Sequence, residues 1–461
     1  MRRSLQALLR VGFLLLATLL VIVLVPMVRQ WLSTLDAGSG LILANTFAVP
    51  SMVLRKVARR LVNNCVFAGG SNVNRSYDDQ FAQKGAKIGS IVTGRLPQRY
   101  EVTIGAVANP TPLTDQTFQV AISDQSNICF EYDSWSATLE VDDYMERYGD
   151  PAVDSLINNI DFTGTSRCYK DVSEATGTPA VIPGSTGTLP LAANQPYTDA
   201  VTRLFDAAAP DPYRALLTSD MHAYLVNGNA TLFNPAADRS AAFRKNQFAS
   251  EALGIDRWFK TQNIPTHVVG ALGGTPLVNL ANQSGASINL TGCGAAAVTA
   301  YFRQGDSIDF AGVFSINPMS HQSTGRLKRF TVTADTDLAA GPGTLAVPIS
   351  PSIITSGPWA TVSASPANAA AVRTFGHASS YAGLSTPQGL VWNKDAFALV
   401  MADLTLPRGL WVSERISNAK LGISVRMLKD HDIINDVSPA RLDTAHGWKT
   451  IRENLAARVC S

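Results

Sequence analysis

The first pattern along the chain is a run of 18 residues without a charged side chain, Val11–Val28, which lies between Arg10 and Arg29. As a helix it would rise ~1.5 Å per residue and reach ~27 Å, close to the ~30 Å of a bilayer's hydrocarbon core. Hydropathy therefore predicts a membrane span. The alternative is that residues 1–43 are a dispensable leader from a misplaced start, because the composition changes at the Gly-rich joint Ala37–Gly40.

A helical period follows the leader. Between Pro50 and Phe67, apolar residues recur at helical spacing opposite three arginines, which predicts a basic amphipathic helix. The helix is either an ordinary surface helix or an arm that lies on an acidic neighbour. On the second interpretation its cations are expected at a subunit interface. They are Arg55, Arg59 and Arg60.

After this helix, apolar and polar residues alternate along the chain. Residues 85–132 contain two alternating runs around a Pro/Asn turn, which predicts a long β-hairpin. The hairpin is too long and too polar on both faces to be wholly buried in its own subunit. Its charged residues Arg95, Arg99 and Asp115 are therefore expected to contact other subunits. Charge reversal at Arg99 is expected to impair association while leaving the monomer nearly as stable.

A long helix is expected from about residue 138 to 160. Acidic residues crowd its first turn, where the helix dipole favours negative charge. Three of them could face one another as a reactive cluster, but helix-start residues are the simpler interpretation. Together with the neighbouring arginine they form a second group of expected interface residues: Asp142, Asp143, Glu146 and Arg147.

The remaining pattern predicts an α+β chain. Residues 164–197 are rich in Gly, Thr, Pro and Ser and are expected to form a loop. Short alternating segments between Gly/Pro turns predict a small β barrel or sandwich from residue 273 to about 370. Further helices are expected at 198–209, 211–226, 237–253 and 392–401, and strands from residue 422 to the end.

Composition and charge narrow the class of protein. The 461 residues are 46% hydrophobic and 16% charged, which excludes wholesale disorder. Net charge is only +2, and residues 1–60 carry +7, leaving −5 for the rest, so a broad basic surface for nucleic acid is excluded. The five widely spaced cysteines form no C-x-x-C pair, which favours buried thiols in a reducing compartment over a disulfide framework.

No catalytic constellation can be found in the sequence. None of the six histidines lies three or four residues from another, so no helical metal pair is present. The Gly-rich segment Gly270–Thr275 lacks the lysine of a phosphate-binding loop, and there is no G-x-S-x-G elbow. We therefore expect no catalytic residue, no metal and no cofactor. A chain with an arm, a projecting hairpin and a long helix is more typical of an assembly subunit than of an enzyme.

The sequence resembles the coat proteins of tailed bacteriophages, specifically the P22 coat protein family. The order and spacing of several segments carry the resemblance, which spans roughly residues 44–460. The segments are Asn45–Phe47 with Leu61–Phe67, Val141–Tyr148, Gly305–Val313, Asp395–Leu399 with Leu406–Gly409, and Gly422–Arg426 with Gly447–Ile451.

The resemblance implies a Hong Kong ninety-seven type capsid fold with an inserted β-barrel-like domain. The implied divisions are an N-terminal arm (44–84), an extended loop (85–132), a peripheral domain with the long spine helix (133–185), an axial domain in two parts (186–272 and 373–420), the inserted β domain (273–372) and a return to the peripheral domain (421–461). Such coat proteins have no membrane span before the arm, which favours the misplaced start.

The resemblance also implies a function and its partners. Copies would form pentamers and hexamers of an icosahedral shell, assembled in the host cytoplasm, that encloses double-stranded DNA without reading its sequence. A scaffolding protein and a portal protein would be the other partners. The rival interpretation is a membrane-anchored, β-rich surface or adhesion protein that uses Val11–Val28 as a genuine span. A membrane fraction assay would separate the two.

Overall fold

The computed structural model describes residues 66–69, 72–75, 91–100, 102, 106, 115–133, 150–186, 191–229, 251–341, 343–375, 381–418 and 423–461. All of them belong to one compact unit, Leu54–Ser461. The apolar run Val11–Val28 lies outside these residues. Among the helices of the described ranges, none combines the length and apolarity that crossing a membrane requires.

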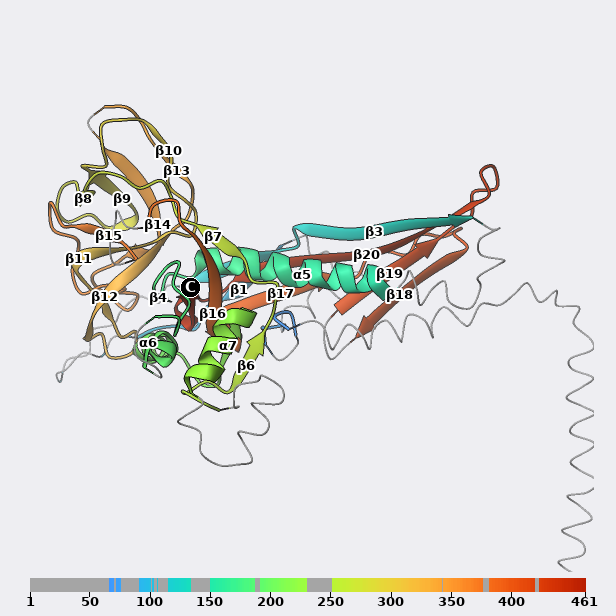
Figure 1. Ribbon diagram of the computed structural model, residues 1–461, viewed down its shortest axis with the longest axis horizontal. Coiled ribbons are helices and arrows are strands. Elements are labelled where there is room, and N and C mark those ends of the chain that lie inside the picture. Colours follow the sequence, from blue (N-terminus) through green and yellow to red (C-terminus); the bar gives the residue numbers. More distant parts are fainter. Residues whose placement is uncertain are drawn as a thin grey trace, which may run out of the picture. The chain divides into compact units, whose positions relative to one another are not determined.

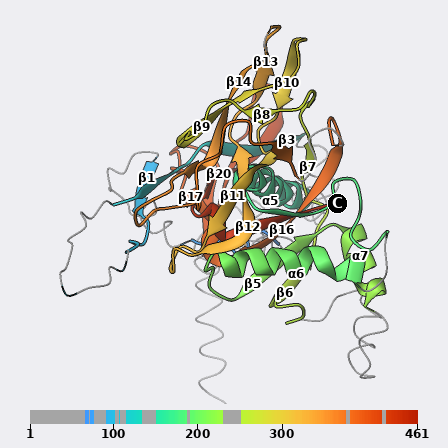
Figure 2. The ribbon, with the colours of Figure 1, turned by 90° about the vertical axis from the view of Figure 1, so that its left-hand side faces the viewer.

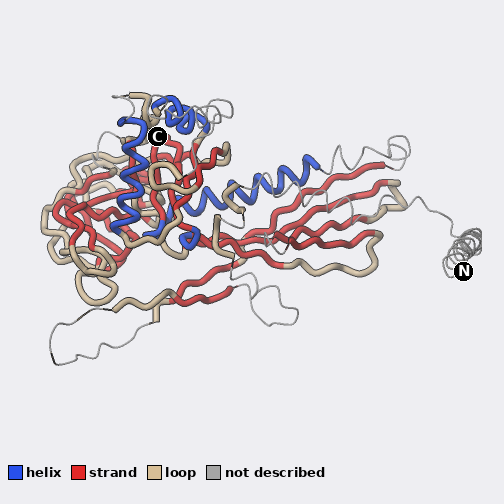
Figure 3. The backbone as a smooth tube through the Cα atoms, turned by 90° about the horizontal axis from the view of Figure 1, so that it is seen from below, coloured by secondary structure: helices blue, strands red, loops and turns tan. Residues whose placement is uncertain are grey.

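A long antiparallel sheet forms one part of this unit (Figure 1). Strand β20 (Val437–Thr450) is its centre and pairs with β17 (Phe397–Ala402), β19 (Ile423–Lys429) and β3 (Asp124–Asp133), while β18 (Val412–Asn418) extends it beyond β19. The helix α5 (Asp150–Asp171) runs alongside β3 and β20, as Figure 3 also shows.

The helix α5 covers this sheet with one apolar face. Val153, Leu156, Ile157 and Ile160 recur at helical spacing and are buried. They share a core with aromatic residues from distant parts of the chain, among them Phe67, Trp392, Phe397 and Trp448. Burial of so much apolar surface is the main force that holds helix and sheet together.

A second sheet lies at the other end of α5. Its order is β4 (Ala175–Gly177), β21 (Ala456–Cys460), β16 (Ser385–Asn393), β5 (Tyr213–Leu217) and β6 (Arg257–Lys260), with β7 (Thr266–Val268) paired to β16. Helices α6 (Leu191–Asp206) and α7 (Ser219–Gly228) pack beside each other here (Figure 2). Their buried residues form a core of their own with Tyr213, Trp258 and Val459.

Residues 277–374 form the predicted β barrel. Its strands run in the order β15 (Val372–Thr374), β11 (Ser307–Ile316), β12 (Ser323–Val332), β14 (Leu345–Ile353), β9 (Gly285–Thr291) and β8 (Leu277–Val278), with β10 (Val298–Phe302) and β13 (Thr336–Leu338) as a separate pair. A bridge between Leu277 and Ala371 joins the two ends. Closure removes the strand edges that an open sheet would expose.

The remaining elements are short. β1 (Ile91–Arg95) pairs with β2 (Thr117–Ala121) in antiparallel register, from Ile91 opposite Ala121 to Arg95 opposite Thr117. Two 3₁₀ turns, η2 (Lys394–Ala396) and η3 (Glu453–Leu455), connect strands of the two large sheets.

Two predicted elements were wrong, the loop at 164–197 and the helix at 392–401, and three others were right only in part. The helix that includes Val153 continues to Asp171, and Gly164, expected in a loop, lies inside it. A Cβ at Gly164 would be 2.5 Å from Trp448 Cε2, so only glycine lets that ring pack against the helix. The predicted loop also contains β4 and the start of α6. The start of the helix expected from residue 138 lies outside the described residues.

The helix expected at 211–226 is confirmed only in its second half, and the helix expected at 392–401 is largely strand. Residues 213–217 form β5, buried at every position, and the helix α7 begins only at Ser219. Residues 397–401 belong to β17, which is buried throughout this stretch. A continuous apolar run buried on both faces has no period, so it does not distinguish strand from helix. The helix expected at 237–253 lies almost wholly outside the described residues.

The predicted hairpin is confirmed only for its first part. β1 and β2 pair as expected, but the chain leaves the hairpin after Ala121, and β3 joins β20 instead. The expectation of buried thiols holds for Cys168, Cys293 and Cys460, whereas Cys129 on β3 is exposed.

Candidate assembly surface

The β1–β2 hairpin is fixed to the long sheet at its base. Phe118 and Val120 point to one face of β2 and are buried, while their neighbours on the other face are exposed. They pack against Ala398 and Val400 of β17, with Leu96 at the margin of the cluster. One more backbone bond, from the Leu96 amide to the Gln116 carbonyl at 2.8 Å, continues the pairing beyond β1.

Charged side chains cross the hairpin beyond this base. The Arg95 guanidinium lies 3.6 Å from the Asp115 carboxylate, with 81% and 51% of the two side chains exposed. The Gln98 amide also donates to Asp115. Because both charges are so accessible, the pair contributes only ~0–1 kcal/mol to the subunit's stability. Its charges remain available to a neighbouring molecule.

Arg99 faces its own chain. Its guanidinium carbon lies 4.9 Å from the ring centroid of Trp359, which belongs to the loop between β14 and β15. Burial lowers the pKa of Arg99, and the neighbouring positive charge of Arg452 lowers it further. The expectation that charge reversal here would spare the monomer is therefore not supported by the geometry, because the stacking on Trp359 would be lost.

A cleft of about 520 Å³ separates the hairpin base from the barrel. Leu96, Pro97 and Arg99 form the hairpin side, and Trp359 forms part of the barrel side. The segment Lys449–Asn454 lines it as well. A smaller hollow of about 110 Å³ shares Arg99, Glu453 and Asn454 with it.

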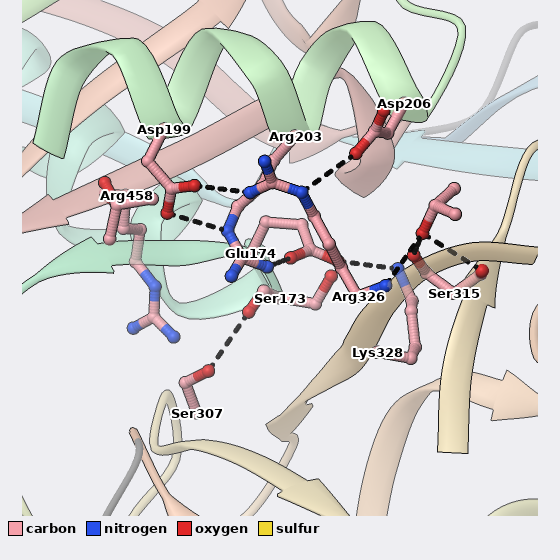
Figure 4. A network of polar contacts seen from close by, with 12 residues as sticks. Ser173, Glu174, Asp199, Arg203, Asp206, Ser307, Ser315, Arg326, Lys328 and Arg458 are labelled. Carbon is pink, nitrogen blue, oxygen red and sulfur yellow. Dashed lines mark hydrogen bonds and ion pairs between the residues drawn. The ribbon is translucent and has the colours of Figure 1, made fainter. Parts of the chain in front are cut away.

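A network of buried charges surrounds the smaller hollow (Figure 4). Glu174, between α5 and β4, binds Lys328 Nζ at 3.0 Å and the Arg203 guanidinium at 2.7 Å. Burial by itself would raise the pKa of Glu174, but the two cations outweigh it and lower the pKa to about 2. The carboxylate is therefore charged at any physiological pH.

The network continues along α6 toward the barrel. Arg203 also contacts Asp199 one turn earlier, at 3.2 Å. Arg326 of β12 bridges Asp199 at 2.5 Å and Asp206 at 3.4 Å. Charges of alternating sign thus join α6 to β12, which fixes the barrel against α6. Networks of this kind hold orientation more than they add stability.

A second polar junction lies at the turn between β10 and β11, at the start of the Gly305–Val313 motif. Asp306 Oδ1 is 2.8 Å from His267 Nε2, and its other oxygen accepts the amides of Arg303 at 2.7 Å and Gly270 at 3.2 Å. The Tyr169 hydroxyl of α5 lies 3.3 Å from His267 Nδ1. This motif therefore anchors the barrel entry to β7 and to the end of α5.

The middle of the predicted arm, at Phe67 and Ala68, is tied to α5. The backbone amides of Phe67 and Ala68 donate to Asp161 Oδ1 at 3.0 and 2.9 Å. The Phe67 ring stacks on Trp448, with centroids 5.1 Å apart. Trp392 Nε1 donates to the Asn72 carbonyl at 2.8 Å. Phe67, Ala68 and Asn72 are thus buried in the core.

The predicted interface residues divide into two groups. Arg95, Arg99 and Asp115 lie at the hairpin, where Arg95 and Asp115 pair with each other and Arg99 turns to the barrel. The others lie outside the described residues: Arg55, Arg59, Arg60, Asp142, Asp143, Glu146 and Arg147. Within the described ranges, no three His, Cys, Asp or Glu side chains are grouped so that they could hold a metal ion.

Sequence reasoning missed the residues that join the barrel to its surroundings. Trp359 stands in a Ser-Gly-Pro-Trp turn, where an isolated aromatic residue could have indicated a contact. Glu174, Arg203 and Lys328 gave no such signal, because they come from three distant segments whose meeting depends on the tertiary structure.

Comparison with known proteins assigns the chain to a family. The family model described as P22 coat protein, gene protein 5, matches residues 49–457. The chain therefore belongs to the P22 coat protein family, and it has the α+β, Hong Kong ninety-seven type capsid fold expected above. It is a major capsid protein, a structural protein whose copies form the icosahedral shell of the virion.

Solved capsid structures are similar at low sequence identity. A structure titled Mycobacterium phage Che8 is 12% identical, covers 86% of this chain and 90% of its own, and has a TM-score of 0.44. The capsid of Ralstonia phage GP4 is 9% identical, with coverage of 86% and 88% and a TM-score of 0.40. No curated protein matches the sequence. These structural likenesses are remote, so the assignment rests on the family match.

Proposed function

We propose that copies of this chain form the pentamers and hexamers of the shell, and that the β1–β2 hairpin extends to the neighbouring copy within them. The observation that carries the proposal is the exposure of Arg95 and Asp115 on a hairpin whose other face is buried on β17. A repeated modest contact suffices, because many copies make it at once in a closed shell.

The division of the chain into functional parts belongs to the same proposal. Residues 44–84 serve as the N-terminal arm, and residues 85–132 as the extended loop. Residues 133–185 and 421–461 build the peripheral domain, and residues 186–272 and 373–420 the axial domain. Residues 273–372 are an inserted domain. Support comes from the apolar clusters, since one of them draws its fully buried residues only from positions 269–372.

The partners follow from charge. The basic arm with Arg55, Arg59 and Arg60 suits an acidic partner, either a scaffolding protein or a neighbouring coat subunit. The slightly negative remainder of the chain suits an inner surface that encloses double-stranded DNA without gripping it. A portal protein occupies one vertex, assembly takes place in the host cytoplasm, and the chain has no catalytic activity.

Charge reversal at Arg95 tests the role of the hairpin. Arg95→Glu should slow or abolish shell formation, followed by light scattering and negative-stain microscopy. The melting temperature of the isolated monomer should remain nearly unchanged, because the pair with Asp115 is exposed. The double variant Arg95→Asp with Asp115→Arg is the matched control, since it restores a pair inside the hairpin but exchanges the two charges.

The control separates two roles of the pair. If it serves a neighbouring copy, the exchanged variant stays defective although its own hairpin is paired. Full recovery of assembly in the exchanged variant would show that the pair acts only within the hairpin. Normal assembly of Arg95→Glu would likewise overturn the proposal.

A further inference from the structure

The hairpin is supported at two separate places. Phe118 and Val120 hold its base on β17 of the long sheet. Arg99 holds it on the barrel through Trp359, and both residues line the cleft of about 520 Å³. One support alone would leave the hairpin free to pivot about its base, whereas two supports fix its direction.

Trp359 is fixed to the barrel. Its loop closes on itself through bonds from the Ala360 amide to the Gly357 carbonyl at 3.1 Å and from the Thr361 amide to the Ile354 carbonyl at 2.8 Å. The next residues, Ala360 and Val362, are buried. Val362 belongs to the barrel core. The indole ring therefore moves with the barrel and not with the hairpin.

Arg99 belongs to the hairpin, and neighbouring charges and rings set the direction of its side chain. It lies four residues beyond Arg95, the last residue of β1, and Leu96 between them packs at the base cluster. Arg452 presents a like charge to it across the cleft. The face of Trp359 attracts the guanidinium, because a ring's quadrupole favours a cation above it. Repulsion from Arg452 and attraction to Trp359 together direct the Arg99 side chain to the barrel.

We infer that Arg99 and Trp359 form a strut that sets the angle at which the hairpin leaves the subunit. Through this contact the barrel controls the geometry of the shell. The inference rests on the proposed role of the hairpin between copies. Whether a head-to-tail contact closes into a ring or continues as an open array depends on its rotation. When the strut is lost, the copies should therefore still assemble, but the particles should have a different shape.

The test compares variants of Trp359 in the full chain. Trp359→Ala should still assemble. Electron micrographs should show particles of varied diameter instead of one uniform diameter, together with incomplete or curled products. Trp359→Phe keeps an aromatic face and should restore shells of wild-type diameter. Arg99→Ala should match Trp359→Ala, and the double variant should be no worse than either. Only a small loss of monomer melting temperature is expected, about 1–3 °C.

Two further variants isolate the inference. Ile288→Ala destabilises the barrel core from β9, away from the Trp359 loop, and it should give shells of normal diameter. If it broadens the diameters as much as Trp359→Ala does, loss of stability and not loss of the strut is the cause. Shells of normal, uniform diameter from Trp359→Ala would also overturn the inference. Failure of the hairpin's proposed role is recognised separately, by normal assembly of Arg95→Glu.

Discussion

Lys328 of the barrel strand β12 forms a buried ion pair with Glu174, which follows α5; its Nζ lies 3.0 Å from Glu174 Oε1. The side chains are only 11% and 8% exposed, so neither charge has water as an alternative partner. Removing one member of such a pair leaves the other uncompensated, at a cost of about 3–5 kcal/mol.

We expect Glu174→Gln to be more damaging than Lys328→Met. Glu174 neutralises two cations, Lys328 and Arg203, whereas after loss of Lys328 the carboxylate still has Arg203 at 2.7 Å. Urea unfolding of monomers should show a loss of about 3–5 kcal/mol for Glu174→Gln and a smaller one for Lys328→Met. Arg257→Gln, which removes an exposed pair with Asp256, is the control and should cost at most ~1 kcal/mol. The reverse ranking would contradict this account of the network.

Glu453 makes stability depend on pH in the opposite sense from a normal salt bridge. Burial raises its pKa from 4.5 to about 6, although the hydrogen bond from Ser350 and the charge of Lys328 lower it in part. A carboxyl with a raised folded-state pKa favours the folded state fully below pH 4.5, and this contribution is lost as the pH rises through 6.

Glu453→Gln should therefore raise the melting temperature at pH 7.5, because an uncharged amide replaces a carboxylate that is ionised at a cost. The advantage should shrink as the pH falls from 7.5 to 4.5, where the native carboxyl is itself neutral. Differential scanning calorimetry across this range measures the effect. The exposed Glu251→Gln is the control, and an advantage that is constant with pH would rule out ionisation of Glu453 as its source.

The sequence predicted the elements whose period is clear. The barrel region shows strands of alternating residues between Gly/Pro turns, and its closure by Leu277 and Ala371 fits the barrel interpretation. The helix α6 was missed at its start although Ala193, Tyr197, Ala200 and Leu204 are spaced as a buried helical stripe. Its Pro196 and polar neighbours resemble a loop, because propensity and the apolar period disagree there.

The surface was harder to predict than the fold. Arg95 and Asp115 are exposed, as the polar faces of the hairpin suggest, but their contact with other subunits stays a prediction. The turn of Arg99 toward Trp359 was not, because a contact across about 260 residues depends on how the barrel is placed, and no local pattern encodes that. The assembly function came from the ordered motifs of a family, not from any single residue.

Asp161 should be the residue of α5 that is most sensitive to substitution by alanine. It accepts the amides of Phe67 and Ala68 and is fully buried. Asp161→Ala leaves both amides without that acceptor, at about 1–3 kcal/mol each. Asp161→Asn keeps a carbonyl oxygen and should lose less.

Ser155→Ala is the control for this series, because Ser155 lies on the exposed side of the helix and its hydroxyl bonds only to the Pro151 carbonyl one turn away. Chemical unfolding of the three variants gives the comparison. If Asp161→Ala were as stable as Ser155→Ala, the attachment of residues 66–68 to α5 would contribute nothing to the fold.

Residues 273–372 should fold when expressed alone. Their buried apolar residues, including Ile288, Phe310, Phe330 and Val347, form a single cluster with no fully buried member outside 269–372. The bridge from Leu277 to Ala371 holds the two ends of the segment together, so excision leaves no long gap to close. The ~100 residues are a common size for an independent domain.

Lys328 would lose Glu174 but would become exposed to water, so the excised domain avoids the cost that Glu174→Gln has in the whole chain. A dispersed amide NMR spectrum and one cooperative melting transition are expected. A collapsed spectrum would show instead that the barrel depends on its contacts with α5 and α6 to fold.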